Sequence, residues 1–167
     1  GLFGYHKSTR ATYSCTARTK DGTGSGWVGR GYNRASQIDA GGFYGIAAEK
    51  AVRSANPRPL EPGVYEAILE PSATADLLGG FSFNLDARSA DEGRSFFAKK
   101  GGGNKLGEKL FDDKIRIYSD PTDEEVPGNP FGAGGLPQRK IVWIENGALK
   151  NLAYSRYWAQ KQGKEPV

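Results

Sequence analysis

The chain has 167 residues, of which 37% are hydrophobic and 24 are glycine, a composition typical of a turn-rich globular protein. Its net charge is only +4 and its lysines and arginines are scattered among acids, so we predict no nucleic-acid partner. No apolar run approaches the roughly 20 residues that span a bilayer, which predicts no membrane segment, and the single cysteine fits a cytoplasmic protein without disulfides.

The first third of the chain is predicted to form a β-hairpin and then a helix. Residues 9–18 are rich in threonine and tyrosine, Asp21-Gly22 supplies a turn, and Trp27-Val28 resumes the β pattern. Residues 36–39 have the spacing of a capping box, which predicts a helix from there to about Ser54. The predicted core face of this helix consists of Phe43, Ile46, Ala47 and Ala51.

Residues 24–29, Gly-Ser-Gly-Trp-Val-Gly, have the glycine spacing of a dinucleotide-binding loop. That loop requires a buried strand before it and a helix that begins at its last glycines. Here a polar turn comes first and Trp27-Val28 favours a strand, so we predict no nucleotide site.

The middle of the chain is predicted to contain a proline-rich connector, a strand over residues 64–70 and a helix that begins at Pro71-Ser72. Four apolar residues of that helix recur at intervals of three and four, which predicts that one face lies in the core. They are Leu77, Leu78, Phe81 and Leu85.

The last third alternates strand and turn signals. Residues 114–118 alternate between polar and apolar, whereas residues 141–144 are apolar on both faces and predict a central strand. Asn146-Gly147 predicts a tight hairpin turn, residues 120–138 a long surface loop, and residues 154–162 a short helix.

Together these elements predict an α+β fold with mainly antiparallel strands, two principal helices and a C-terminal β-hairpin. We divide the sequence into residues 1–62, which hold the first hairpin and helix, and residues 63–167. The chain begins with Gly1 and contains no methionine, so we expect an internal piece of a longer protein.

Few residue combinations suit catalysis. His6 is the only histidine, so neither paired histidine ligands for zinc nor a Ser-His-acid triad can be assembled from this sequence. Cys15 lies in a strand-like setting, and we interpret it as a structural thiol.

A group of charged residues follows the second helix: Asp86, Arg88, Asp91, Glu92 and Arg94. Paired acids hydrolyse glycosides only when both face one cleft, and the spacing here does not indicate that. We predict a salt-bridged helix end. Arg94 and Ser95 are our candidates for binding an anion or a peptide backbone.

Six segments carry a family resemblance, and their order along the chain makes it specific. They are Asp21–Trp27, Leu69-Glu70-Pro71, Arg94–Phe97, Lys105–Glu108, Trp143–Leu152 and Tyr154–Ala159. In these segments the chain resembles the TldD/PmbA family (peptidase U62), the zinc peptidases and partner subunits once called modulators of DNA gyrase. The resemblance implies a curved, partly closed sheet with the second helix lying against it.

In the zinc-bearing branch of that family, a helix after a Leu-Leu pair carries His-Glu-x-x-x-His. Here Gly79 and Gly80 stand at the positions of the first histidine and the glutamate, and Asn84 stands at that of the second histidine. An amide is a poor zinc ligand. The resemblance therefore implies the TldE/PmbA-like branch, with no metal ligand and no catalytic residue in this chain. A further family ligand, a cysteine, would lie beyond Val167.

A second departure lies in the long loop. Related sequences have an acidic Phe-Asp-x-Glu-Gly stretch where this chain has Phe131-Gly132-Ala133-Gly134-Gly135. Two acids are missing. We interpret the segment as a longer, glycine-rich loop.

The resemblance implies a metal-free subunit of a cytoplasmic TldD/TldE-type metalloprotease complex that processes peptides. Such a subunit pairs with a zinc-bearing TldD-like peptidase, or forms a homo-oligomer, and encloses unfolded peptide in a shared chamber. Zinc would then belong to the partner. Two alternatives stay open: a metallopeptidase whose site lies in segments outside this sequence, and a non-enzymatic peptide-binding scaffold.

Overall fold

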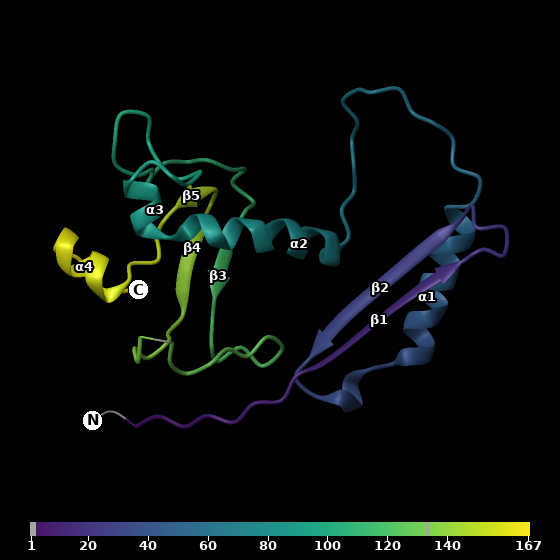
Figure 1. Ribbon diagram of the computed structural model, residues 1–167, viewed down its shortest axis with the longest axis horizontal. Helices are drawn as coiled ribbons and strands as arrows, with labels where there is room; N and C mark the ends of the chain where they lie inside the picture. Colours follow the sequence, from purple (N-terminus) through teal and green to yellow (C-terminus); the bar gives the residue numbers. More distant parts are fainter. Residues whose placement is uncertain (1–2, 133) are drawn as a thin grey trace. The chain divides into compact units, whose positions relative to one another are not determined.

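The computed structural model describes residues 3–132 and 134–167 and has the predicted α+β fold with antiparallel sheets. Its contacts divide the chain into two compact units (Figure 1). The N-terminal unit contains residues 7–73, and the C-terminal unit contains residues 74–167 together with residues 3–6. The division of the sequence at residue 62 stays a prediction. No helix among the described residues is both long and apolar enough to cross a membrane.

The N-terminal unit is built on the predicted hairpin of β1 (Ala11–Arg18) and β2 (Ser25–Tyr32). Its turn is closed by a hydrogen bond of 3.0 Å from the Thr19 amide to the Gly24 carbonyl, and the Asp21 carboxylate accepts three further bonds within the turn. Cys15 lies opposite Val28 in the register and is half-buried. The β pattern in the sequence thus predicted this hairpin correctly.

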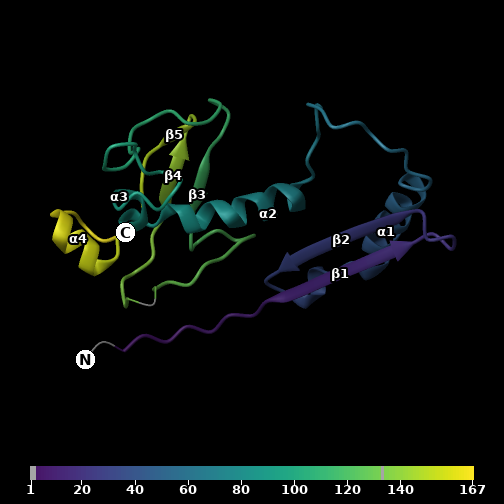
Figure 2. The ribbon, with the colours of Figure 1, turned by 45° about the horizontal axis from the view of Figure 1, so that its top comes forward.

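Helix α1 (Ala40–Arg53) covers one face of the hairpin, as Figures 1 and 2 both show. Val28, Ala47 and Ala51 are buried between the two elements. The approach is so close that a Cβ at Gly26 would lie 2.1 Å from the Ala47 carbonyl oxygen. Residues 24–29 therefore form a turn and a strand, and their glycine spacing serves strand–helix packing.

The predicted start of α1 was wrong. Residues Ala35–Gln37 form a separate 3-10 turn (η1), and the helix begins after Asp39, whose carboxylate accepts a hydrogen bond of 3.0 Å from the Gly42 amide. The Asp39 carboxylate thus has the capping role that the sequence pattern of residues 36–39 predicted for the Ser36 hydroxyl. The predicted core face was wrong at Ile46, which is 40% exposed.

The strand predicted over residues 64–70 does not form. These residues belong to neither sheet, and Val64 and Ile68 are 103% and 99% exposed. A strand needs a hydrogen-bonded neighbour, and none of the described residues provides one. An ion pair of 2.6 Å between Lys50 and Glu70 fixes the end of the segment to α1.

Helix α2 (Pro71–Ser82) begins where the sequence predicted, but only its last turn reaches the core. Phe81 packs edge-on against Phe97, with 5.3 Å between the ring centroids, and Leu85, in the 3-10 turn that follows α2, is 6% exposed. Leu77 and Leu78 are 66% and 40% exposed, so the predicted core face was wrong at these two positions. They precede the turn at which the helix meets the rest of the C-terminal unit.

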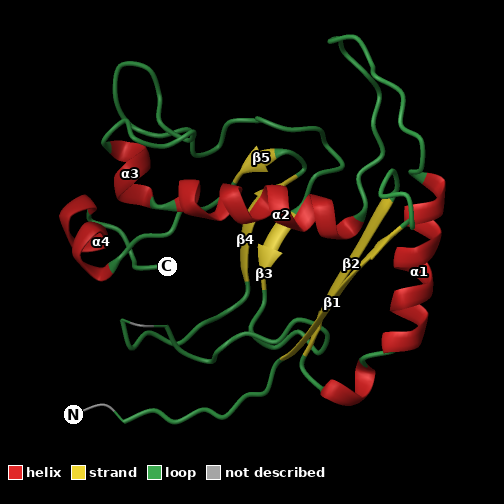
Figure 3. Ribbon diagram, turned by 45° about the vertical axis from the view of Figure 1, so that its right-hand side comes forward, coloured by secondary structure: helices red, strands yellow, loops and turns green. Residues whose placement is uncertain are grey.

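In the C-terminal unit, β4 (Ile141–Glu145) is the middle strand between β3 (Ile117–Ser119) and β5 (Ala148–Leu149), as Figure 3 shows. The central strand and its hairpin were predicted correctly: Asn146 and Gly147 have φ of 49° and 74°, as a tight primed turn requires. β3 is shorter than predicted because residues 112–115 form a turn. The Asp112 carboxylate accepts a hydrogen bond from the Lys114 amide and holds this turn.

The strands form two separate sheets, and neither is closed among the described residues, so the partial closure implied by the family resemblance is not found there. Short elements complete the C-terminal unit: η2 (Phe83–Leu85), α3 (Ala87–Asp91) and α4 (Arg156–Gln162). Their inner faces form one core with β4 and β5, in which Phe97, Ile144 and Leu149 are fully buried.

Candidate functional site

The end of α2 carries Gly79 and Gly80, the positions at which the family resemblance places the first histidine and the glutamate of a metal motif. Gly79 and Gly80 lie in the last turn of this helix and are exposed. A Cβ added at either position would meet no atom within 4 Å. The space that two larger side chains would need is therefore open, and no neighbouring side chain occupies it.

Asn84 has a structural role. Its side-chain amide donates to the Gly80 carbonyl over 3.1 Å, and its side-chain oxygen accepts from the Phe96 amide over 3.0 Å. The Ser95 hydroxyl donates to the Asn84 carbonyl over 2.7 Å. Asn84 thus joins the end of α2 to the segment that carries Phe96 and Phe97.

A zinc ion of the family's kind does not fit these residues. Zinc requires histidine, cysteine or carboxylate ligands within about 2.0–2.3 Å. Two of the three motif positions have no side chain, and both polar atoms of Asn84 are hydrogen-bonded within the chain. Within residues 3–132 and 134–167, no three His, Cys, Asp or Glu side chains gather in a way that would hold a metal.

The charged residues after α2 form a salt-bridged helix end, as predicted. Arg88 donates to Glu92 over 2.8 Å, and Arg94 contacts the second oxygen of the same carboxylate. The pKa of Glu92 is lowered, first by the hydrogen bond from Arg88 and then by that from Arg94. Glu92 is therefore ionised at neutral pH and does not suit the role of a general acid.

The other two acids of this group stabilise the fold. Asp86 caps α3 by accepting from the Ser89 amide over 2.7 Å. The Asp91 carboxylate accepts from the side-chain amide of Asn104 over 2.6 Å and from the Trp158 indole over 2.7 Å. Because each carboxylate is bound to a different part of the chain, the acids do not form a catalytic pair.

Both candidate peptide-binding residues make contacts within the chain. Arg94 is paired with Glu92. The Ser95 hydroxyl, besides its bond to Asn84, accepts from the Phe97 amide over 3.0 Å. A bound peptide would have to compete with these partners, and peptide binding by Arg94 and Ser95 stays a prediction.

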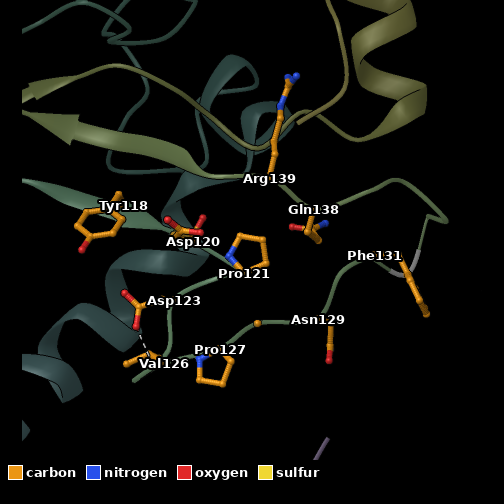
Figure 4. A pocket seen from close by; sticks show the side chains of 13 residues that line it. Tyr118, Asp120, Pro121, Asp123, Val126, Pro127, Asn129, Phe131, Gln138 and Arg139 are labelled. Carbon is orange, nitrogen blue, oxygen red and sulfur yellow. Dashed lines mark hydrogen bonds between the residues drawn. The ribbon is translucent and has the colours of Figure 1, made fainter. Parts of the chain in front are cut away.

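The long loop from Asp120 to Gln138 surrounds a hollow of about 600 Å³, which sequence reasoning missed (Figure 4). Its walls come largely from rings and aliphatic groups of Tyr118, Pro121, Val126, Pro127 and Phe131. The prolines, which we interpreted only as marks of a surface loop, were the one signal in the sequence that bore on this cavity.

Hydrogen bonds within the loop hold the hollow open. The Asp120 carboxylate accepts from the Thr122 hydroxyl over 2.7 Å and from Lys140 over 3.0 Å. The pKa of Asp120 is lowered by these two groups, with the Thr122 bond as the larger cause. The amides of Gly128 and Gln138 donate to the carbonyls of residues 121 and 130 over 3.1 and 2.8 Å.

The glycine-rich departure from the family pattern lies at the rim of the hollow. Phe131 and Gly132 both line it, and a Cβ at Gly132 would lie 2.6 Å from the side-chain nitrogen of Gln138. Gln138 thus occupies space that a larger residue at position 132 would need. Ala133 lies outside the described residues.

A second hollow of about 650 Å³ adjoins the first and shares Gly132, Gln138 and Arg139 with it. Ile141, Tyr154 and Tyr157 contribute to its other walls. The C-terminal unit therefore offers two neighbouring places where a ligand would be partly enclosed.

The comparisons with known proteins agree on one family. The model of the PmbA/TldA metallopeptidase C-terminal domain, which describes the TldD/PmbA family, matches residues 62–167. A metalloprotease of Methanothermobacter thermautotrophicus is 31% identical over 123 residues, which are 71% of this chain and 25% of the relative. An uncharacterised protein of Methanocaldococcus jannaschii is 33% identical over 125 residues, 71% of this chain and 27% of the relative. The chain thus spans about a quarter of the length of these relatives.

Solved structures share the fold. A protein of Thermotoga maritima described as a candidate modulator of a DNA gyrase superposes with a TM-score of 0.80 at 23% identity, covering 94% of this chain and 36% of that one. TldE of Thermococcus kodakarensis superposes with a TM-score of 0.69 at 22% identity, covering 94% and 35%.

Proposed function

Since this chain belongs to the TldD/PmbA family of metallopeptidases, we propose that it is part of a metal-free, TldE-type subunit of a cytoplasmic peptidase complex. In this proposal a TldD-like partner supplies the zinc and the catalytic residues. This chain supplies wall and binding surface for an unfolded peptide that the complex processes.

One observation carries the proposal: the residues at the family's metal positions are unsuited to zinc. Gly79 and Gly80 bring no ligand atom, and Asn84 is hydrogen-bonded to the backbone on both sides of its amide. Substituting Asn84 would break contacts that join α2 to the Phe96 segment. The sequence at this site is thus adapted to holding the fold together.

Exposed apolar side chains support the proposal that a second protein chain binds this one. Val64 and Ile68 lie in one segment of the N-terminal unit and are 103% and 99% exposed. Large apolar side chains that gather on a protein surface commonly mark contacts with other chains. A TldD-like subunit is the partner that the family favours, and a second copy of this protein is the alternative that the experiment below separates from it.

The test is a pull-down of the full-length protein together with the zinc-bearing family member from the same organism, followed by metal analysis. We expect a complex that contains zinc. Replacing the partner's two motif histidines by alanine should remove the zinc, and the matched replacement Asn84→Ala in this protein should leave it in place.

Three other results would reject the proposal. Zinc and peptidase activity in the full-length protein alone would indicate an independent metallopeptidase. Peptide binding without a partner or a metal would indicate a scaffold, and self-association that excludes the partner would indicate a homo-oligomer.

A further inference from the structure

We propose that the hollow lined by Tyr118, Pro121, Val126, Pro127 and Phe131 binds an uncharged apolar side chain of an extended peptide. The inference rests on the proposed function, in which the protein handles unfolded peptide. It adds a place on this chain for that peptide and a preference for one class of side chain. None of the six segments that carry the family resemblance lies within residues 118–139.

The walls of the hollow have the chemistry of an apolar socket. Tyr118, Pro121, Pro127 and Phe131 present ring surfaces, and the volume of about 600 Å³ lies within the range of ligand sites in proteins. Figure 4 shows the Pro121 ring in the middle of the group, with Tyr118 and Phe131 at opposite sides. Transfer of an aromatic or aliphatic side chain from water into such surroundings is favourable.

Both aromatic side chains of the hollow have partners within the C-terminal unit. The Tyr118 ring has the guanidinium of Arg116 at 5.4 Å and the Lys140 ammonium at 4.8 Å from its centroid. The Phe131 ring packs on the backbone of Gly4 so closely that a Cβ there would lie 3.2 Å from it. A socket whose walls are already fixed loses less conformational entropy when a ligand binds.

The chemistry of the hollow disfavours an acidic ligand. Its charged lining residues are Asp120, Asp123 and Arg139. Asp120 pairs with Lys140 over 3.0 Å, and the Asp123 carboxylate accepts from the amides of residues 125 and 126 over 2.9 Å. An acidic side chain would lose its hydration among the rings, and it would meet two carboxylates there besides the single guanidinium of Arg139.

Gln138 offers the matching group for a peptide backbone. It lines the hollow, and none of the described residues forms a hydrogen bond with its side-chain amide. A primary amide has one acceptor and two donors, so it can pair with the N–H and C=O of one residue of an extended peptide, which point to the same side. The ligand is therefore placed by its backbone and selected by its side chain.

The test uses the full-length protein and fluorescein-labelled heptapeptides of glycine and serine with one central phenylalanine, glycine or aspartate. Fluorescence anisotropy should show that the phenylalanine peptide binds about tenfold more tightly than the glycine peptide. The aspartate peptide should bind no better than the glycine peptide.

Phe131→Ala and Tyr118→Ala should each reduce the preference for phenylalanine to less than about threefold, because each removes part of the wall. The matched control is Tyr157→Ala, in the adjoining hollow. Tyr157 and Tyr118 are similarly exposed, at 54% and 45%, and we expect the control to keep the preference. Thermal unfolding of each variant verifies that it folds.

Equal affinity for the three peptides would overturn the inference, and so would loss of the preference in Tyr157→Ala alone. If the protein captures its partner but shows no side-chain preference, this inference fails while the proposed function stands. If it shows the preference but captures no partner, the proposed function fails while the socket stands.

Discussion

Replacing Asn84 by alanine perturbs the end of α2 most directly, because the amide of Asn84 makes one hydrogen bond as donor and one as acceptor. The bonds measure 3.1 Å to the Gly80 carbonyl and 3.0 Å from the Phe96 amide. A hydrogen bond contributes about 0.5–1.5 kcal/mol to folding, so the loss of both lowers the free energy of unfolding by about 1–3 kcal/mol.

The assay is chemical denaturation of the chain, followed by the fluorescence of Trp143 and Trp158, which lie in the same unit as Asn84. A Trp27→Phe background removes the tryptophan of the other unit. Asn84→Asp serves as a matched variant because it keeps the acceptor and loses the donor, so we expect about half of the loss. An unfolding free energy for Asn84→Ala within about 0.5 kcal/mol of the parent would refute the structural role that we assign to Asn84.

Three further outcomes follow from other sites. Gly26→Ala should lower the free energy of unfolding by about 1–3 kcal/mol, because the new Cβ would collide with the backbone of α1. Gly45→Ala, in α1 itself, should raise the free energy of unfolding by about 0.5–1 kcal/mol, because the space around Gly45 is open. Circular dichroism on heating compares the two, and equal effects would contradict the close packing. Gly79→Ala should likewise raise the midpoint temperature of thermal unfolding. A lower midpoint would show that neighbouring atoms leave no space for a side chain at position 79. The pKa of Glu92 is lowered in the folded state by Arg88, so its ionised form stabilises the fold above the ordinary carboxyl pKa, and this contribution is lost as pH falls through the lowered value. Glu92→Gln should therefore be less stable than the parent at pH 7 and equal to it in strong acid, and a difference that persists in acid would exclude this cause.

Local patterns predicted the elements whose stability is local. Asn146-Gly147 determines its own turn because both residues adopt positive φ. The strand pattern of residues 11–32 predicted the first hairpin for the same reason, since its two strands pair with each other. The salt-bridged helix end was also predictable from the sequence, because Arg88 and Glu92 lie four residues apart.

Predictions failed where the outcome depends on distant partners. Residues 64–70 have a strand pattern but no neighbour to pair with among the described residues. The periodicity of α2 shows which face is apolar, but it does not show that only Phe81 and Leu85 reach the core. Nor does spacing reveal that Asn84 bonds to Phe96, or that loop residues from 118 to 139 surround one hollow.

The most direct test of the central claim is a crystal structure of the full-length complex, with anomalous diffraction measured at the zinc edge. We predict an anomalous peak at the partner's His-Glu-x-x-x-His helix and no peak beside residues 79–84 of this chain. A peak within about 2.0–2.3 Å of side chains of this chain at that place would contradict the account.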